Sequence, residues 1–193
     1  MIPTETYRPI VEQLLRHGAR PEDARRLTEQ LYRRGYSAKE VVFHEGDRNP
    51  PVVYLLSGYL QLYNTNEAGH NYVRILAGPG DFAGCVEGTL YNQPASYTIE
   101  CVTDCQLAII DNHLQNLIRQ NPEWYQLLQD FILRRILSLS REKEVMLPMK
   151  ATDRYLYFRE RYPQFVSHIP AGVIADYIGV RPQSLSRIKQ SLR

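Results

Sequence analysis

The last stretch of the chain, residues 171–193, gathers side chains whose chemistry suits nucleic acid. Guanidinium, ammonium, amide and hydroxyl groups are the groups that bind phosphates and base edges. Six side chains of these kinds lie close together: Arg181, Gln183, Ser184, Ser186, Arg187 and Lys189. Acidic side chains, which would repel phosphates, are absent from residues 177–193. This composition favours DNA binding; the alternative is an amphipathic helical hairpin that only closes a domain.

Two helices joined by a turn would hold these side chains in place. Apolar residues recur at helical spacing on both sides of the turn: Val173, Ile174, Tyr177 and Ile178 before it, and Leu185, Ile188 and Leu192 after it. Gly179 can take the left-handed conformation that ends a helix, and Pro182 suits the first position of the next one. The spacing therefore predicts a helix-turn-helix whose second helix enters the major groove of DNA.

Earlier in the chain, short strands alternate with turns. The expected strands are Glu40–His44, Val52–Leu56, Tyr59–Thr65, Asn71–Ala77, Ser96–Val102 and Gln106–Ile110. Short strands at this spacing indicate an antiparallel barrel or roll. Two helices, over residues 6–17 and 21–35, should precede the strands. The fold class expected for the whole chain is α+β.

A long helix is expected between the strands and the helix-turn-helix. Asn121 and Pro122 suit its beginning, and Pro148 its end. Asp111 or Asn112 should cap a shorter helix before it, and Thr152 the helix after it. The apolar residues expected to form a seam on the long helix are Leu128, Phe131, Ile132, Ile136 and Leu139. This seam either pairs two copies in a homodimer or lies on the strands of its own chain.

Several phrases of the sequence resemble the Crp/Fnr family of bacterial transcription regulators. IADYIGVRPQSLSRI resembles the DNA-binding end of that family. EVVFHEGD, VVYLLSGYLQLY, GPGDFAG and IECVTDCQLAIID resemble, in the same order, its cyclic-nucleotide-binding β-roll. The resemblance covers the chain from about Tyr36 onward. The segments it implies are N-terminal helices over 1–35, a β-roll sensor over 36–110, a short helix and a long dimerisation helix over 111–148, and a helix-turn-helix DNA-binding domain over 149–193.

The resemblance also implies partners and residue roles. The partners are double-stranded DNA, a second copy of the chain, and RNA polymerase. By position against the family motif, the residues that face base edges are Gln183, Ser184 and Arg187, and those that face phosphates are Arg181, Ser186 and Lys189. Arg187 is the expected bidentate donor to guanine. Family members usually continue into a β-hairpin wing; since this chain stops at Arg193, we expect a truncated winged-helix-like reader without a wing.

The ligand pocket of the family departs from its pattern here. A cyclic phosphate needs an arginine fork, and the ribose hydroxyl needs a carboxylate. Cys85 stands in the position of the ribose-binding glutamate, and Ala95 in that of the phosphate-binding arginine. A buried anion without a charged partner is poorly compensated, so we predict that cyclic AMP is not a physiological ligand. The residues expected around the pocket, whose effector is unknown, are Gly84, Cys85, Val86, Glu87, Ala95 and Ser96.

Charge is distributed unevenly along the 193 residues. The net charge is +2, but residues 150–193 carry 8 Lys+Arg and 3 Asp+Glu, a net +5, which leaves −3 for residues 1–149. A basic end on a neutral or acidic body suits nucleic-acid binding. The sequence shows no run of eighteen apolar residues and no secretory signal, and three cysteines make no disulfide framework. We therefore expect a cytoplasmic protein without a membrane segment.

No pattern in the sequence points to an enzyme, a metal site or a cofactor. Histidines at metal-ligand spacing, a P-loop, a dinucleotide fingerprint and a nucleophile motif are all missing. Cys85, Cys101 and Cys105 are too few for an iron–sulfur cluster on four thiolates; the last two are expected in the core. We expect a sequence-specific DNA-binding regulator. The alternative is a ligand-binding or protein-interaction module whose DNA-binding end is weak or non-functional.

Overall fold

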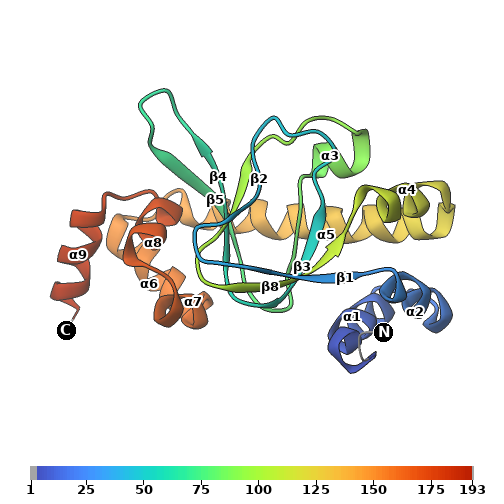
Figure 1. Cartoon of the computed structure of the whole chain (residues 1–193). Coiled ribbons are helices and arrows are strands. Elements are labelled where there is room, and N and C mark those ends of the chain that lie inside the picture. Colours follow the sequence, from blue (N-terminus) through green and yellow to red (C-terminus); the bar gives the residue numbers. More distant parts are fainter. Residues whose placement is uncertain (1–3, 193) are drawn as a thin grey trace.

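The computed structural model describes residues 4–192. Helices lie at both ends of a β-roll, and one long helix, α5, runs beside the roll from one end to the other (Figure 1). Up to α4 the elements are η1 (Thr4–Tyr7), α1 (Arg8–Arg16), α2 (Pro21–Glu29), β1 (Tyr32–Tyr36), β2 (Val41–Phe43), β3 (Val52–Ser57), β4 (Leu60–Thr65), β5 (Asn71–Ala77), β6 (Phe82–Ala83), α3 (Val86–Tyr91), β7 (Thr98–Cys101), β8 (Cys105–Ile110) and α4 (Asn112–Gln120). After them come α5 (Pro122–Met146), α6 (Ala151–Arg161), α7 (Pro163–His168), α8 (Ala171–Ile178) and α9 (Pro182–Ser191).

The roll consists of two antiparallel four-stranded sheets. Their strand orders are β1-β8-β3-β6 and β2-β7-β4-β5. Apolar side chains of both sheets meet in one core, in which Leu55, Leu60, Leu62, Ile99 and Leu107 are fully buried. Alternation of inward and outward residues along each strand makes this packing possible. The expected antiparallel roll within an α+β fold is confirmed.

The N-terminal boundary of the roll differs from the prediction. The helix that begins at Pro21 ends at Glu29 and does not reach Gly35. Residues Tyr32–Tyr36 instead form β1, which pairs with β8 from Tyr32 opposite Ile109 to Tyr36 opposite Cys105. This pairing satisfies backbone groups that would otherwise leave β8 as an open edge. The roll therefore starts at Tyr32; the boundaries predicted near residues 111 and 149 remain proposals.

The two helices that follow the roll begin at the expected capping residues. The Asp111 carboxylate accepts a hydrogen bond from the backbone N–H of Leu114 at 2.9 Å. The Asn121 side chain accepts from Glu123 N at 3.1 Å and from Trp124 N at 3.2 Å. Each cap satisfies donors that a helix start leaves free. The second cap starts α5, which has 25 residues.

The four C-terminal helices, α6–α9, form a unit that we call the reader. Gly179, with φ of 68°, ends α8 in the left-handed conformation, and Pro182 begins α9. Two predictions in this unit are wrong. Thr152 does not cap α6, because the helix already begins at Ala151 after Lys150. Leu192 lies past the end of α9 and is 38% exposed, so only Leu185 and Ile188 make the buried stripe. Helix α7 was not expected.

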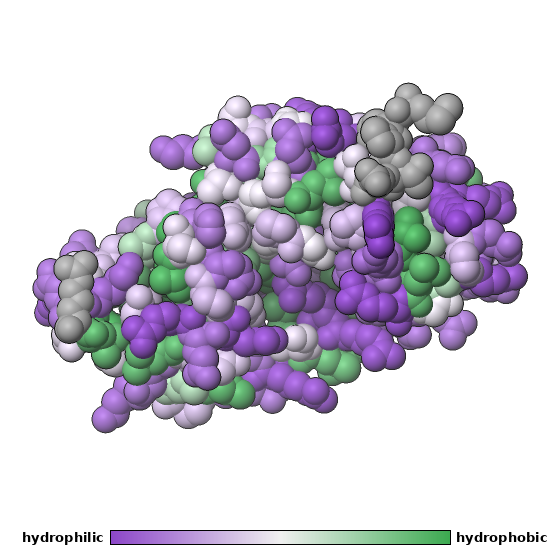
Figure 2. Space-filling view, turned by 90° about the horizontal axis from the view of Figure 1, so that it is seen from below, coloured by the Kyte–Doolittle hydropathy of each residue, from purple (hydrophilic) through white to green (hydrophobic). Residues whose placement is uncertain are grey.

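The reader packs directly against the roll. Tyr59, which directly precedes β4, makes an edge contact with Phe165 at 5.0 Å and stacks on His168 at 5.3 Å between ring centroids. Val73 and Leu76 of β5 belong to the same buried cluster. No helix among residues 4–192 is long and apolar enough to cross a membrane. Figure 2 shows a mainly hydrophilic face on which apolar residues form small separate patches.

Candidate DNA-binding and ligand sites

Helix α9 lies at the outer end of the reader, far from the N-terminal helices (Figure 1). Four of the six predicted DNA-binding residues are exposed: Arg181, Gln183, Ser186 and Arg187. Ser184 and Lys189 are half-buried. No ion pair found between residues 4 and 192 engages any of the three basic side chains. The charged groups of α9 are thus available to an external anion.

Backbone and side-chain contacts hold the turn before α9. The backbone N–H of Val180 donates to the carbonyl of Ala175 at 2.9 Å, which closes the end of α8. Arg154 on α6 donates from Nη2 to the carbonyl of Gly179 at 3.4 Å and from Nη1 to that of Met149 at 3.1 Å. Leu185 of α9 is fully buried against the rest of the reader. The orientation of α9 is therefore set by α6 and α8 together.

A buried carboxylate joins the long helix to the reader. Glu142 on α5 is 6% exposed and accepts hydrogen bonds from the hydroxyls of Tyr162 and Tyr177. Burial, together with the hydrogen bond to Glu142, raises the pKa of Tyr162 to about 12. The same causes raise the pKa of Tyr177 further. Both hydroxyls therefore stay protonated and act as donors at neutral pH. We call these three residues the Glu142 cluster.

The sequence offered only a weak signal for this cluster. Glu142 lies three residues after Leu139 and four before Met146, and so falls on an apolar face of the helix. A carboxylate in such a position needs donors from another element. Which element supplies them depends on the packing of α6–α8 against α5.

The predicted seam of α5 divides between two faces. Leu128, Phe131, Ile132 and Leu139 are half-buried against their own chain. Phe131, for example, makes edge contacts with Phe82 at 5.0 Å and with His17 at 5.3 Å. Ile136 is 45% exposed, as are Leu133 and Leu137 at 54% and 47%. The interpretation that the helix lies on its own roll fits the first group, and the exposed apolar face of α5 consists of Leu133, Ile136 and Leu137.

Three of the six predicted pocket residues, Cys85, Glu87 and Ser96, are joined by hydrogen bonds. The fully buried Cys85 thiol donates to Glu87 Oε2 at 3.2 Å and accepts from the Ser96 backbone N–H at 3.4 Å. Ala95, in the place of the family's arginine, is buried at 3% exposure. The hydroxyl of Tyr97, a residue missed in the sequence, donates to the Gly84 carbonyl at 2.5 Å. Hydrogen bonds within the chain thus use the polar groups at this position.

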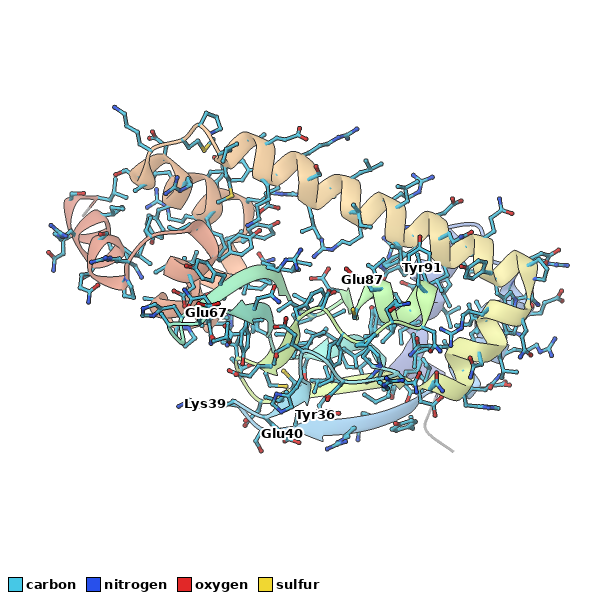
Figure 3. All side chains as sticks on the ribbon, turned by 90° about the horizontal axis from the view of Figure 1, so that it is seen from above. Tyr36, Lys39, Glu40, Glu67, Glu87 and Tyr91 are labelled. Atoms are coloured by element: carbon cyan, nitrogen blue, oxygen red, sulfur yellow. The ribbon has the colours of Figure 1, made fainter. Side chains whose placement is uncertain are left out.

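Glu87 is exposed and lies on α3, on the side of the roll nearer to α5 in Figure 3. Burial alone would raise the pKa of its carboxyl, but hydrogen bonds from its own backbone N–H, Cys85 and Ser96, and the charge of Arg74, together lower it. Arg74 also lies over the Tyr97 ring, with Cζ 5.6 Å from the centroid. Arg74 of β5 therefore brings a positive charge to the region of Glu87 and Tyr97, whose own stretch of sequence contains no Lys or Arg. Lys39 and Glu40 lie at the opposite edge of the roll (Figure 3).

Gly84 and Val86 line a cavity of about 200 Å³ between the roll, α5 and the N-terminal helices. Cys85, Glu87, Ala95 and Ser96 are not among its lining residues. The six predicted residues are therefore close together, but only two of them face the space in which a ligand could lie. Among residues 4–192, no cluster of three His, Cys, Asp or Glu is arranged to hold a metal ion.

Sequence comparisons match the region of the roll with a family model and most of the chain with two relatives. The family model described as "Cyclic nucleotide-binding domain" matches residues 33–121. Two curated relatives, from Pasteurella multocida and Haemophilus influenzae, are both described as the cAMP-activated global transcriptional regulator CRP. They are 25% and 26% identical to this chain over 171 residues. Each alignment covers 81% of this chain, and 80% and 75% of the respective relatives.

Solved structures share the fold. FixK2 from Bradyrhizobium japonicum superposes with a TM-score of 0.74, 15% identity and 84% coverage of each chain. CLP, a c-di-GMP responsive global regulator of Xanthomonas campestris, superposes with a TM-score of 0.68 at 19% identity, covering 90% of this chain and 91% of that one. Residues 33–121 thus match a cyclic nucleotide-binding domain, the chain as a whole is similar to the CRP regulators, and it shares the fold of FixK2 and CLP.

Proposed function

We propose that the chain is a homodimeric, sequence-specific DNA-binding transcription regulator whose effector is not cyclic AMP. The observation that carries the proposal is the two-sided character of α9. Its apolar face is buried through Leu185 and Ile188, while Arg181, Gln183 and Arg187 project from the molecule. A helix anchored in this way and rich in donors suits the major groove. The regulatory role of the CRP relatives supports the same function.

The homodimer is supported by the exposed face of α5. Leu133, Ile136 and Leu137 follow the i, i+3, i+4 spacing of a single helical face and remain open to solvent. A second copy of α5 would cover them and would place two α9 helices about one DNA turn, ~34 Å, apart on a palindromic site. RNA polymerase is included as a partner on the strength of the family resemblance alone.

Selection of bound DNA from a random library, followed by affinity measurements, tests the proposal. Arg187→Ala should weaken binding to the selected site by about 1–3 kcal/mol, or roughly 5- to 150-fold, and relax the preference at one base pair. Lys189→Ala should weaken binding equally on all sequences and reduce the salt slope by about one. Arg159→Ala, an exposed arginine on α6, is the matched control.

Two outcomes would count against this function. If Arg187→Ala bound the selected site as tightly as the unmodified chain, its assignment to base recognition would be wrong. If the library yielded no enriched site, and binding lacked a steep salt dependence, the alternative would hold: a ligand-binding or interaction module with a non-functional DNA-binding end. Cyclic AMP binding at micromolar concentration, measured by calorimetry, would contradict the proposed change of effector.

A further inference from the structure

The cavity between the roll and α5 is mainly apolar. Leu14 and Leu27 line it from the N-terminal helices, Leu62 from the roll, and Ile132 from α5. Its volume of about 200 Å³ exceeds that of an apolar cavity of ~150 Å³ that takes up benzene. The cavity is therefore large enough for an organic ligand, and its walls favour an apolar one.

The cavity is also elongated. Its lining residues on α5 run from Trp124 to Leu139. At about 1.5 Å per residue, fifteen residues correspond to ~22 Å along the helix axis. Ile136 lines the cavity and is 45% exposed in the single chain, so the space reaches the face of α5 that a second copy would cover in the proposed homodimer. A long, narrow molecule fits this shape better than a compact one.

Two residues that line the cavity, Trp124 and Arg135, carry polar groups without a partner among the described residues. Trp124 is 7% exposed, and its Nε1 has no hydrogen-bond acceptor in the part of the chain that the structure describes. A buried donor without an acceptor is costly. Arg135 is the only Lys, Arg, Asp or Glu side chain on the wall, and no ion pair between described residues involves it. The wall thus offers a positive charge and no carboxylate, while the Trp124 Nε1 atom itself is buried.

We propose that this cavity binds an elongated, mainly apolar carboxylic acid, of the chemical class of a medium-chain fatty acid, with its carboxylate paired to Arg135. The apolar walls would hold the chain, and the guanidinium would hold the head. This inference deepens the proposed function by naming the effector class, and rests on that function only for its regulatory meaning. Arg135 lies two helical turns before Glu142 on α5. The ligand carboxylate would therefore pair with the same helix that contacts the reader through Glu142.

Trp124 makes the site measurable, because it is the single tryptophan of the chain and lines the cavity. Decanoate is titrated into the full chain without DNA, with decanol and cyclic AMP in parallel, and binding is followed by tryptophan fluorescence and by calorimetry. Decanoate should give a saturable response at least tenfold tighter than decanol. Arg135→Met should weaken decanoate binding about tenfold and leave decanol unchanged. Arg134→Met, an exposed neighbour outside the cavity, should leave both unchanged.

A second variant keeps the test decisive if Arg135→Met does not fold. Ile132→Phe adds volume to the wall and should weaken decanoate and decanol alike. The absence of a saturable decanoate response would overturn the proposal, as would equal affinities for decanoate and decanol. A response seen only in a monomeric variant would also overturn it, since a second copy would then occupy the space. Because no DNA is present, a negative result for decanoate binding does not affect the DNA-binding test of Arg187. A negative result for DNA binding likewise does not affect the decanoate test.

Discussion

The Glu142 cluster should contribute a large share of the stability of the reader. Glu142 on α5 accepts hydrogen bonds from Tyr162, between α6 and α7, and from Tyr177 on α8. Lys143 Nζ lies 4.4 Å from the centroid of the Tyr177 ring. The cluster thus joins elements that lie up to 35 residues apart in the chain. Its removal should loosen the reader from the long helix.

The expected magnitudes follow from the number of groups left without partners. A hydrogen bond to a charged acceptor contributes about 1.5–3 kcal/mol, so Tyr177→Phe should lower the free energy of unfolding by that amount. Glu142→Leu deprives two hydroxyls of their acceptor at about 1–3 kcal/mol each, or ~2–6 kcal/mol in total. Replacement of the Glu142 carboxylate and of both tyrosine hydroxyls by apolar groups leaves no buried donor without an acceptor and no buried charge. The triple variant Glu142→Leu, Tyr162→Phe, Tyr177→Phe should therefore be more stable than Glu142→Leu alone.

Urea unfolding of the single, double and triple variants measures this coupling through double-mutant cycles. Glu144→Leu, at an exposed position one half-turn away, is the control and should change stability by less than about 0.5 kcal/mol. Additive effects of Glu142→Leu and the tyrosine substitutions would refute the reasoning, because they would mean that the three side chains do not act as a unit. The same conclusion would follow if Glu142→Leu behaved like the control.

Two further predictions concern pH and assembly. Burial and the hydrogen bond to Glu100 raise the pKa of Tyr63 to about 12, and burial with Glu142 raises that of Tyr162 to about 12, from 10.0. Groups that hold their protons more tightly in the fold stabilise it fully below pH 10 and lose that contribution as pH rises towards 12. Urea unfolding should thus show that the free energy of unfolding falls as pH rises above 10. In Tyr63→Phe the slope of this fall should be smaller by at most about 1.4 kcal/mol per pH unit. An unchanged slope would contradict the raised pKa of Tyr63. For assembly, the double variant Leu133→Glu, Leu137→Glu should convert the dimer to a monomer in sedimentation analysis. The control Gln164→Glu, on the exposed surface of α7, should remain a dimer. If the unmodified chain is already a monomer, the proposed dimer contact through α5 is wrong.

Local sequence signals were sufficient for α8 and α9 of the reader and for the long helix. Gly179 adopts positive φ, Pro182 begins α9, and Asp111 and Asn121 cap the helices they precede. In each case the side chain acts on backbone groups within a few residues, so the sequence nearby contains the necessary information. The same holds for the exposed row of Gln183 and Arg187, because helical periodicity separates it from buried Leu185.

The tertiary structure alone decided which distant residues meet. Tyr32–Tyr36 became a strand because β8 offered an edge 69 to 77 residues further along the chain. Arg74 approached Tyr97 and the Glu87 carboxyl across the roll, and Arg135 reached the cavity from α5. Leu128 and Leu133, alike in the sequence, differ because one packs on the roll and the other faces solvent. These outcomes depend on long-range packing, in which the partner of each group is chosen by the fold and not by its neighbours in the chain.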